Sequence, residues 1–335
     1  MITLSDLHAA RTLLRGITTR TRLIEFKTGG PHVSPLLRNM GTSAENQSRL
    51  YLKPENQQPI GAFKLRGAYN KIASLSGEDR QKGVITYSSG NHAQGVAYAA
   101  RALKTKAVIV MPNNAPQIKR DATATLGAEI VLVGPGSDER KTKAEELAAD
   151  HGYIIVPPYN DEKIIAGQGT IGLEILEDIP EVEAILSPVG GGGLISGIAA
   201  AVKLTNPKIN VIGVEPELAA DAQASFRSGK IVQFPAEQVS RTVADGLRTQ
   251  SIGEINFEHI RAYVDDIITV TEDEIREAMK LLAANPQTIA EPSGAVATAG
   301  FLFHRHQRPN TKLNVAIISG GNIEPSMLKS LRREN

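Results

Sequence analysis

The feature that most constrains this chain is a repeated alternation of short, Val- and Ile-rich runs with longer helical patterns. The runs are mostly apolar on both faces, which is typical of parallel strands buried between helices. They lie at Val84–Tyr87, Ala107–Met111, Glu129–Val133, Tyr153–Val156, Ala184–Val189, Asn210–Val214, Asp266–Val270 and Asn314–Ile318. Strand–helix–strand repetition requires right-handed crossovers. The alternation therefore predicts an α/β fold of open parallel sheets with helices on both faces.

Helical patterns fill the intervals between these runs. They are expected at Asn91–Ala102, Gln117–Thr125, Asp138–Asp150, Ile164–Glu177, Leu194–Leu204, Glu272–Ala283 and Ser293–His304. Thr271 and Glu274 have the spacing of a capping box at the start of one helix. Gly127 and Gly152 stand where helix C-caps are expected. Residues 28–48 have the composition of an irregular loop.

The length of the chain indicates more than one domain, because 335 residues exceed what one compact core usually holds. A net charge of +1 gives no reason to expect nucleic acid or a membrane surface as a partner. No apolar run approaches the ~20 residues that span a bilayer. The absence of cysteine excludes disulfides, thiolate metal sites and a cysteine nucleophile. Together with the lack of a visible signal peptide, it favours the cytoplasm.

Four consecutive glycines, Gly190–Gly193, follow an expected strand and precede an expected helix. Glycine lets backbone N–H groups approach an anion closely, and a helix N-terminus adds its dipole. The loop is not a P-loop, because Ile198 and Ala199 stand where Lys and Ser or Thr are required, and it does not fit the dinucleotide fingerprint. The alternative is a turn that packs helix tightly on sheet. Four glycines in succession exceed that need, so we interpret the loop as a phosphate site.

The interpretation of Lys64 depends on three loops elsewhere in the sequence. Lys64 stands between Phe63 and Leu65, whose apolar side chains would desolvate its amine as a covalent role requires. By itself, such a lysine is usually a surface ammonium with a buried stem. Combined with the glycine loop and two further polar loops, Ser88–His92 and Ser319–Asn322, it indicates a site for a phosphorylated aldehyde cofactor, pyridoxal phosphate.

The order of these segments resembles that of a known family, the fold type II pyridoxal-phosphate enzymes, and specifically the serine/threonine dehydratase and serine racemase family. The matching segments are Gly61–Gly67, Ser88–His92, Ile165–Thr170, Gly190–Gly193 and Ser319–Asn322. The resemblance extends from about Leu52 to Asn322. It implies two open parallel-sheet domains, similar to tryptophan synthase β, with the cofactor in the cleft between them.

The resemblance also implies how the domains divide and assemble. A small mobile domain would comprise residues 81–160, inserted into a large cofactor-binding domain of residues 1–80 and 161–335. The small domain would carry the Ser88–His92 loop and close over the substrate. A homodimer is the expected assembly, and a small amino acid is the expected substrate.

Individual site residues follow from the same resemblance. Those assigned to the cofactor are Lys64 as its covalent carrier, Phe63 beside the ring, Asn91 at the ring hydroxyl, Ser319 at the pyridine nitrogen, Glu291 near the ring, and Gly190, Gly191, Gly192, Gly193 and Leu194 around the phosphate. Those assigned to the substrate α-carboxylate are Ser88, Gly90, Asn91 and His92. Ala62 departs from the family, in which serine or threonine is common, without affecting the assignment of Lys64.

Ser319 makes the expected chemistry more specific. A neutral hydroxyl at the pyridine nitrogen, in place of an aspartate, makes the ring a weaker electron sink and favours prompt loss of a β-leaving group. We therefore expect β-elimination from a β-hydroxy amino acid such as L-threonine or L-serine, which yields a 2-keto acid and ammonia. Lys64 would remove the Cα proton. The sequence leaves 3-hydroxyaspartate, phenylserine and a hydroxyectoine-derived amino acid open as substrates.

Ser89 keeps a second activity open. A lone serine in a loop is usually a turn former or N-cap. In the resemblance, Ser89 occupies the position of the acid/base that works on the second face of Cα in serine racemase, opposite Lys64. Amino-acid racemisation is therefore an alternative function. A non-catalytic phosphate- or nucleotide-binding module is a third.

Two acids at the end of an expected strand suggest a cation. Glu215 and Asp221 would ordinarily be solvated surface acids. Their spacing resembles the divalent-cation site of the racemase and related dehydratases. This resemblance implies a structural Mg²⁺ or Ca²⁺ held by Glu215, the Ala219 carbonyl and Asp221, with water completing the shell.

Overall fold

The computed structural model describes residues 1–27, 48–115, 117–134 and 136–333. All but Ser48 of the expected irregular loop at 28–48 lies outside the described residues.

Six strands form the larger of two sheets. Their order is β1 (Ile24–Phe26), β2 (Arg49–Pro54), β10 (Leu313–Ile318), β7 (Ala184–Pro188), β8 (Asn210–Pro216) and β9 (Asp266–Val270). All neighbours are parallel except β1, which pairs antiparallel with β2. Alternate residues of β10 enter different cores, Val315 and Ile317 on one face and Ala316 and Ile318 on the other. A strand that is buried on both faces explains the continuous apolar run in the sequence.

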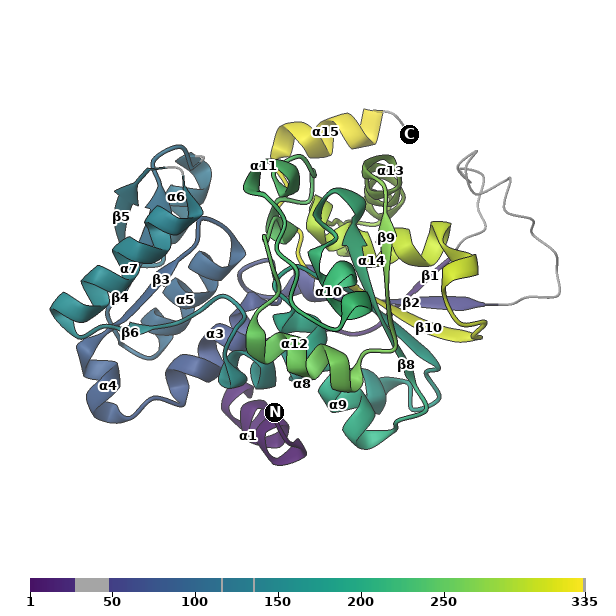
Figure 1. Cartoon of the computed structure of the whole chain (residues 1–335), viewed down its shortest axis with the longest axis horizontal. Helices are drawn as coiled ribbons and strands as arrows, with labels where there is room; N and C mark the ends of the chain where they lie inside the picture. Colours follow the sequence, from purple (N-terminus) through teal and green to yellow (C-terminus); the bar gives the residue numbers. More distant parts are fainter. Residues whose placement is uncertain (28–47, 116, 135, 334–335) are drawn as a thin grey trace.

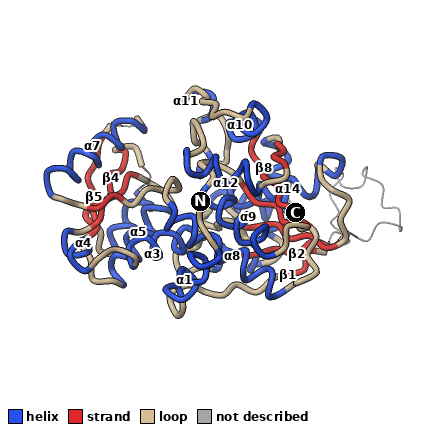
Figure 2. The backbone as a smooth tube through the Cα atoms, turned by 60° about the horizontal axis from the view of Figure 1, so that its bottom comes forward, coloured by secondary structure: helices blue, strands red, loops and turns tan. Residues whose placement is uncertain are grey.

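Four parallel strands form the smaller sheet. Their order is β5 (Glu129–Val133), β4 (Ala107–Pro112), β3 (Val84–Tyr87) and β6 (Ile154–Ile155). Figure 1 shows this sheet at the left and the large sheet at the right, and Figure 2 shows each surrounded by helices. The predicted α/β fold with two open parallel sheets is confirmed. The division into domains of residues 81–160 and 1–80 with 161–335 stays a prediction.

The described residues form the α-helices α1 (Leu4–Leu14), α3 (Lys64–Ala73), α4 (Gly77–Lys82), α5 (Asn91–Ala102), α6 (Gln117–Thr125), α7 (Ser137–His151), α8 (Glu162–Asp178), α9 (Gly193–Thr205), α10 (Asp221–Ser228), α11 (Ala236–Val239), α12 (Glu254–Tyr263), α13 (Glu272–Ala283), α14 (Pro292–Phe303) and α15 (Pro325–Arg333). The capping box of Thr271 and Glu274 is present at the start of α13, and Gly152 ends α7 in a left-handed conformation, as predicted. Within the described residues, none of these helices combines the length and apolarity needed to traverse a membrane.

Three loops of interest leave the carboxyl ends of parallel strands. The Ser88 loop follows β3, the glycine loop follows β7, and the Ser319 loop follows β10. Such strand ends are where open α/β sheets bind ligands. Helix α3, which begins at Lys64, packs against both α5 and α8, so it connects the small sheet to the large one.

Candidate functional site

Backbone contacts bring Lys64 to the loop that follows β10. The Phe63 N–H donates to the Ser319 carbonyl oxygen at 3.0 Å, and Ala62 forms an isolated bridge with Gly320. Gly61 makes this approach possible, because its φ is +72° and an added Cβ would lie 2.4 Å from the Asn322 side chain. Residues that are far apart in the chain therefore meet at the start of α3.

The Lys64 amine has no carboxylate partner within the described residues. Its Nζ donates to the Pro158 carbonyl oxygen at 2.8 Å and lies 5.2 Å from the centroid of the Phe63 ring. Although part of the side chain reaches solvent, the amine is surrounded by protein, and this burial lowers the pKa of Lys64 to about 8. A useful fraction of the amine is therefore neutral near physiological pH, which nucleophilic and basic roles require.

The glycine loop presents a cup of free backbone donors. Of the described residues, none accepts a hydrogen bond from the amide N–H groups of residues 190–195, at the N-terminus of α9. Gly192 is the N-cap, its φ is +94°, and no side chain caps the helix. Unpaired N–H groups and the helix dipole together suit an anion such as a phosphate.

The packing argument used for the glycine loop is wrong. An added Cβ would lie 2.4 Å from the Tyr159 ring at Gly191, 2.9 Å from the Asn256 Cβ at Gly192, and 2.9 Å from the Tyr159 Cβ at Gly193. Three of the four glycines are therefore needed for packing alone. The case for a phosphate depends on the free N–H groups and not on the number of glycines.

The Ser88–His92 loop forms a second set of free donors at the N-terminus of α5. Gly90 is the N-cap without a side-chain cap, and the N–H groups of Ser89, Asn91 and His92 find no acceptor among the described residues. The Gly90 N–H points to the Ser88 hydroxyl at 3.4 Å. The Ser89 hydroxyl has no hydrogen bond within the described residues. This geometry suits a carboxylate, as predicted for the substrate.

The His92 side chain faces away from that role. It is 3% exposed, and its Nε2–H donates to the Val156 carbonyl oxygen at 3.0 Å. Burial, followed by the charge of Lys64, lowers the pKa of His92 to about 3, so the imidazole is neutral. The predicted contact of His92 with a carboxylate therefore depends on its backbone N–H.

Asn91 connects the small-sheet loop to the large-sheet loops. Its Nδ2 donates to Glu291 Oε1 at 2.6 Å, and its Oδ1 accepts from Asn322 Nδ2 at 2.7 Å. Burial is the main reason that the pKa of Glu291 rises to about 7. Gly320 passes directly over this pair, since an added Cβ would lie 2.2 Å from Glu291 Oε1. The Ser319 hydroxyl is 4% exposed and has one long contact, 3.4 Å, to the Ser293 carbonyl oxygen.

Sequence reasoning missed the segment that precedes α8. Pro158 supplies the acceptor for Lys64, and Tyr159 covers the glycine loop. Burial raises the pKa of Tyr159 to about 12, with smaller contributions from Tyr87 and Asp221. The available signal in the sequence was Tyr159, an aromatic residue between the pair Pro157–Pro158 and Asp161. Asp161 is the N-cap of α8, and its carboxylate accepts hydrogen bonds from two N–H groups of that helix.

Glu215 and Asp221 are buried together, so the alternative that they are solvated surface acids is wrong. Both are 0% exposed. Glu215 accepts from the N–H groups of Ala222 and Gln223, whereas neither Asp221 oxygen has a hydrogen-bond partner in the described part of the chain. Burial raises the pKa of Asp221 to about 8, and burial followed by the Asp221 charge raises that of Glu215. The described part of the chain contains no group of three or more His, Cys, Asp or Glu side chains that could hold a metal.

Comparison with known proteins identifies the family. Residues 28–320 match the model of a family described as pyridoxal-phosphate dependent enzyme. The chain is 42% identical over 291 residues to the L-threo-3-hydroxyaspartate ammonia-lyase of Saccharomyces cerevisiae, covering 87% of this chain and 88% of that protein. It is 43% identical over 333 residues to the L-threonine ammonia-lyase of Thermotoga maritima, covering 98% and 77%.

A solved structure has the same architecture. Maize serine racemase superposes with a TM-score of 0.88 at 33% sequence identity, covering 98% of this chain and 96% of that one. The family match spans most of the chain, and two relatives exceed 40% identity over most of their length. The chain therefore belongs to the family of pyridoxal-phosphate dependent enzymes, as the resemblance in its sequence predicted.

Proposed function

We propose that this protein is a pyridoxal-phosphate dependent ammonia-lyase. It removes water from a β-hydroxy amino acid such as L-threonine or L-serine and releases a 2-keto acid and ammonia. The observation that carries the proposal is the Lys64 amine, which has a lowered pKa, no anionic partner among the described residues, and two sets of free N–H donors nearby. Relatives at 42–43% identity are named ammonia-lyases of L-threo-3-hydroxyaspartate and L-threonine.

The residues present suit the cofactor. Lys64 would hold it covalently, the free N–H groups of residues 190–195 would bind its phosphate, and the Ser319 hydroxyl would donate to its ring nitrogen. Asn91 would lie at the ring hydroxyl, since its side chain already stands among the polar groups of Glu291 and Asn322. When bound, pyridoxal phosphate supplies an electron sink conjugated to the Cα of the amino acid.

The substrate would be oriented by the loop after β3. The free N–H groups of Ser89, Asn91 and His92 bind its α-carboxylate at the positive end of α5. Once the amine of the substrate has taken its place on the cofactor, the free Lys64 Nζ would accept the Cα proton, for which a pKa of about 8 is well matched to neutral pH. The Cβ–O bond would then break, and the departing hydroxide would leave as water with the proton that Lys64 had taken from Cα. After release, the enamine product becomes an imine, and a second water hydrolyses it to the 2-keto acid and ammonia. The neutral Ser319 hydroxyl keeps the electron sink weak, which favours this elimination.

A panel of β-hydroxy amino acids tests the proposal and identifies the substrate. L-threonine, L-serine, L-threo-3-hydroxyaspartate and phenylserine are each incubated with the enzyme, and keto acid and ammonia are quantified. We expect equimolar products from at least one of them. Borohydride should bleach the visible band of the bound cofactor and leave a stable label on Lys64. Absence of both products from every substrate, or a label on another lysine, would refute the proposal.

Amino-acid racemisation is a second candidate function. The Ser89 hydroxyl has no partner among the described residues, so it is free to exchange a proton on the face of Cα opposite Lys64, and a serine racemase shares the architecture. Chiral chromatography after incubation with L-serine measures it. Ser89→Ala should abolish D-serine formation and retain pyruvate formation. If wild-type enzyme forms no D-serine, the candidate is eliminated.

We also propose that Glu215, the Ala219 carbonyl and Asp221 bind Mg²⁺ or Ca²⁺. Two buried carboxylates without a cationic partner are costly, and a hard cation with oxygen ligands neutralises them. Two carboxylates, one carbonyl and several waters complete such a shell. Titration of EDTA-treated protein with either ion, followed by its melting temperature, measures binding. An unchanged melting temperature with both ions would contradict the site.

Residues 81–160 are proposed to form a small domain that closes over the substrate. All strands of the smaller sheet belong to this segment, and Asn91 of its Ser88–His92 loop forms hydrogen bonds with Glu291, the N-cap of α14, and with Asn322 in the loop after β10. Substrate should slow hydrogen exchange in the loop and at residues 319–322; equal exchange with and without substrate would contradict closure. A homodimer, measured by light scattering, and a cytoplasmic location remain predictions.

A further inference from the structure

A cavity lies away from Lys64, where β2 and β10 begin. Its volume is about 360 Å³, and it is lined by Ser48, Arg305, His306, Arg308, Pro309 and Asn310. Ser48 directly precedes β2, and Asn310 lies just before β10. Ser319 follows the opposite end of β10, so roughly 20 Å of strand, at ~3.3 Å per residue, separates the cavity from the cofactor site. The two sites are therefore distinct.

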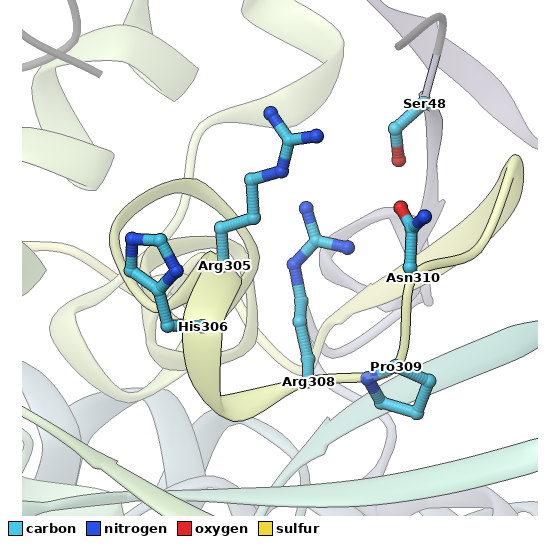
Figure 3. Close-up of a pocket in the computed structure, with 6 residues that line it drawn as sticks. All are labelled: Ser48, Arg305, His306, Arg308, Pro309 and Asn310. Atoms are coloured by element: carbon cyan, nitrogen blue, oxygen red, sulfur yellow. The ribbon is translucent and has the colours of Figure 1, made fainter. Parts of the chain in front are cut away.

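The cavity concentrates positive charge. Figure 3 shows the guanidinium groups of Arg305 and Arg308 directed toward the same space as the Ser48 hydroxyl and the Asn310 amide. Neither arginine forms an ion pair in the part of the chain that the structure describes. No Asp or Glu occurs in the sequence from Pro292 to Ile323. Among the described residues, the positive charge of the cavity therefore has no ion-pair partner.

Arg308 is held in a fixed orientation. Its guanidinium carbon lies 4.1 Å from the centroid of the Phe301 ring, and its Nε donates to the Phe301 carbonyl oxygen at 3.3 Å. Burial, followed by the charge of Arg305, lowers the pKa of Arg308 to about 10, so the group is still a cation at neutral pH. Its terminal N–H groups have no partner among the described residues. A desolvated cation beside a second cation is unfavourable until an anion neutralises it.

The opposite wall is also rigid. The Ser48 hydroxyl donates to the Thr311 carbonyl oxygen at 2.8 Å and accepts from Asn314 Nδ2 at 3.0 Å. Leu313 of β10 pairs in register with Arg49 of β2, so these two chain segments cannot move apart without breaking the sheet. Arg308 and the Ser48 side of the cavity are therefore held in place without a ligand.

We propose that this cavity binds the phosphate group of a small phosphate monoester between Arg305 and Arg308. The planar fork of a guanidinium matches phosphate oxygens and can donate two hydrogen bonds to them. Two arginines balance the two charges of a monoester. The volume lies within the ~300–1,000 Å³ typical of small-molecule sites, which leaves room for an organic part beside the phosphate.

Calorimetric titration of the holoenzyme with glycerol 3-phosphate in chloride buffer tests the proposal. The holoenzyme is used because its cofactor already fills the N–H cup after β7. We expect one binding event per chain, with affinity lowered at least about tenfold in Arg305→Gln. Arg308→Lys keeps the charge but loses the fork, so it should also weaken binding. Lys312→Gln removes an exposed cation outside the cavity and should bind like wild type.

Several results would overturn the proposal. They are no heat of binding with wild type, wild-type affinity in Arg305→Gln, an equal loss in Lys312→Gln, or equal affinity for sulfate, which would indicate general anion attraction. In ligand-free buffer, Arg305→Gln should melt at or above the wild-type temperature, because it removes a like charge beside Arg308. A lower melting temperature would assign Arg305 a structural role instead.

Discussion

Lys53 and Lys64 lie eleven residues apart in the sequence, and the amines of both are buried. The surroundings of the two amines are opposite. Lys53 in β2 is fully buried, and its Nζ donates to Glu174 Oε2 at 2.6 Å and to the Thr21 carbonyl oxygen at 2.7 Å. The Lys64 amine donates to the Pro158 carbonyl oxygen and to no other described residue. Lys53 is thus neutralised by an anion, whereas Lys64 has no neutralising anion among the described residues.

Lys53 belongs to a balanced cluster of charges. Arg66 donates to Glu55 Oε2 and to Glu174 Oε1, each at 2.7 Å, so two cations face two anions in the interior. Arg66 lies two residues after Lys64 on α3. The balanced cluster therefore anchors the helix that presents the unbalanced amine. The contrast shows two uses of a buried charge. A buried charge that is paired with an opposite charge stabilises the fold, whereas one without such a partner is available for chemistry or ligand binding.

Removing the unbalanced amine should have the largest effect. We expect Lys64→Ala to lower keto-acid formation by at least about 1,000-fold, because both the covalent carrier and the base are lost. The fold should persist, since the Lys64 amine contributes one hydrogen bond, to a carbonyl. Assay of keto acid alongside Lys82→Ala, an exposed lysine on α4, measures the effect. Comparable turnover in the two variants would show that Lys64 is not catalytic.

Breaking the balanced cluster should affect stability. Arg66→Met leaves Glu55 and Glu174 buried with one cation fewer, so the free energy of unfolding should fall by about 3–5 kcal/mol. The matched control is Arg276→Met, which breaks an exposed pair with Asp273 and should cost at most about 1 kcal/mol. Urea denaturation compares them. Equal losses would mean that the cluster does not anchor α3.

The acidic pair of Glu215 and Asp221 can also be tested by measuring stability. In EDTA, Asp221→Asn should raise the free energy of unfolding by about 1–3 kcal/mol, because it removes a buried carboxylate that has no partner. The same variant should lose the gain in melting temperature that Mg²⁺ or Ca²⁺ gives the wild type. Thermal denaturation with and without each ion measures both effects. Glu217→Gln is the control, since this neighbour is exposed. A variant that keeps the full response to the ions would exclude Asp221 as a ligand.

The pH dependence of Lys64 should show the smallest effect. The neutral amine is the reactive form, and its pKa is lowered from 10.5 to about 8. In cofactor-free protein, the rate of aldehyde addition at Lys64 should therefore rise about tenfold per pH unit below 8 and level off above it. Peptide mass spectrometry follows the modified lysine, and Lys53 should stay unmodified while the protein is folded. A rate that still climbs tenfold per unit above pH 9 would indicate an ordinary lysine.

The sequence predicted the secondary-structure elements that have a local sequence signature. The eight Val- and Ile-rich runs all contain strands, and the Thr271–Glu274 capping box and the Gly152 C-cap are present. It missed β1 and β2, and in β2 Arg49 and Lys53 interrupt the apolar pattern. Lys53 can be buried there only because Glu174, 121 residues away, supplies an anion. A periodic pattern contains no information about such a distant partner.

For the candidate site, too, some properties could be predicted from the sequence and others could not. The lysine and the glycine loop could be proposed from their residue types, and the other positions were proposed from the resemblance to a known family. Their electrostatic states could not. The pKa of Lys64 depends on enclosure by Pro158 and its surroundings, and the burial of Glu215 and Asp221 depends on neighbours that the linear pattern does not identify.

Sequence alone determined the α/β architecture, because strand periodicity and helix caps are local properties of the chain. The family and the residues to test followed from the resemblance of its motifs to a known family. Tertiary structure alone decided which charges are neutralised. It balances Lys53 and Arg66 with Glu55 and Glu174, and it leaves Lys64 and Asp221 without a counter-charge among the described residues. The physical reason is that the free energy of a buried charge is set by the groups within a few ångströms of it, and folding selects those groups from distant parts of the sequence.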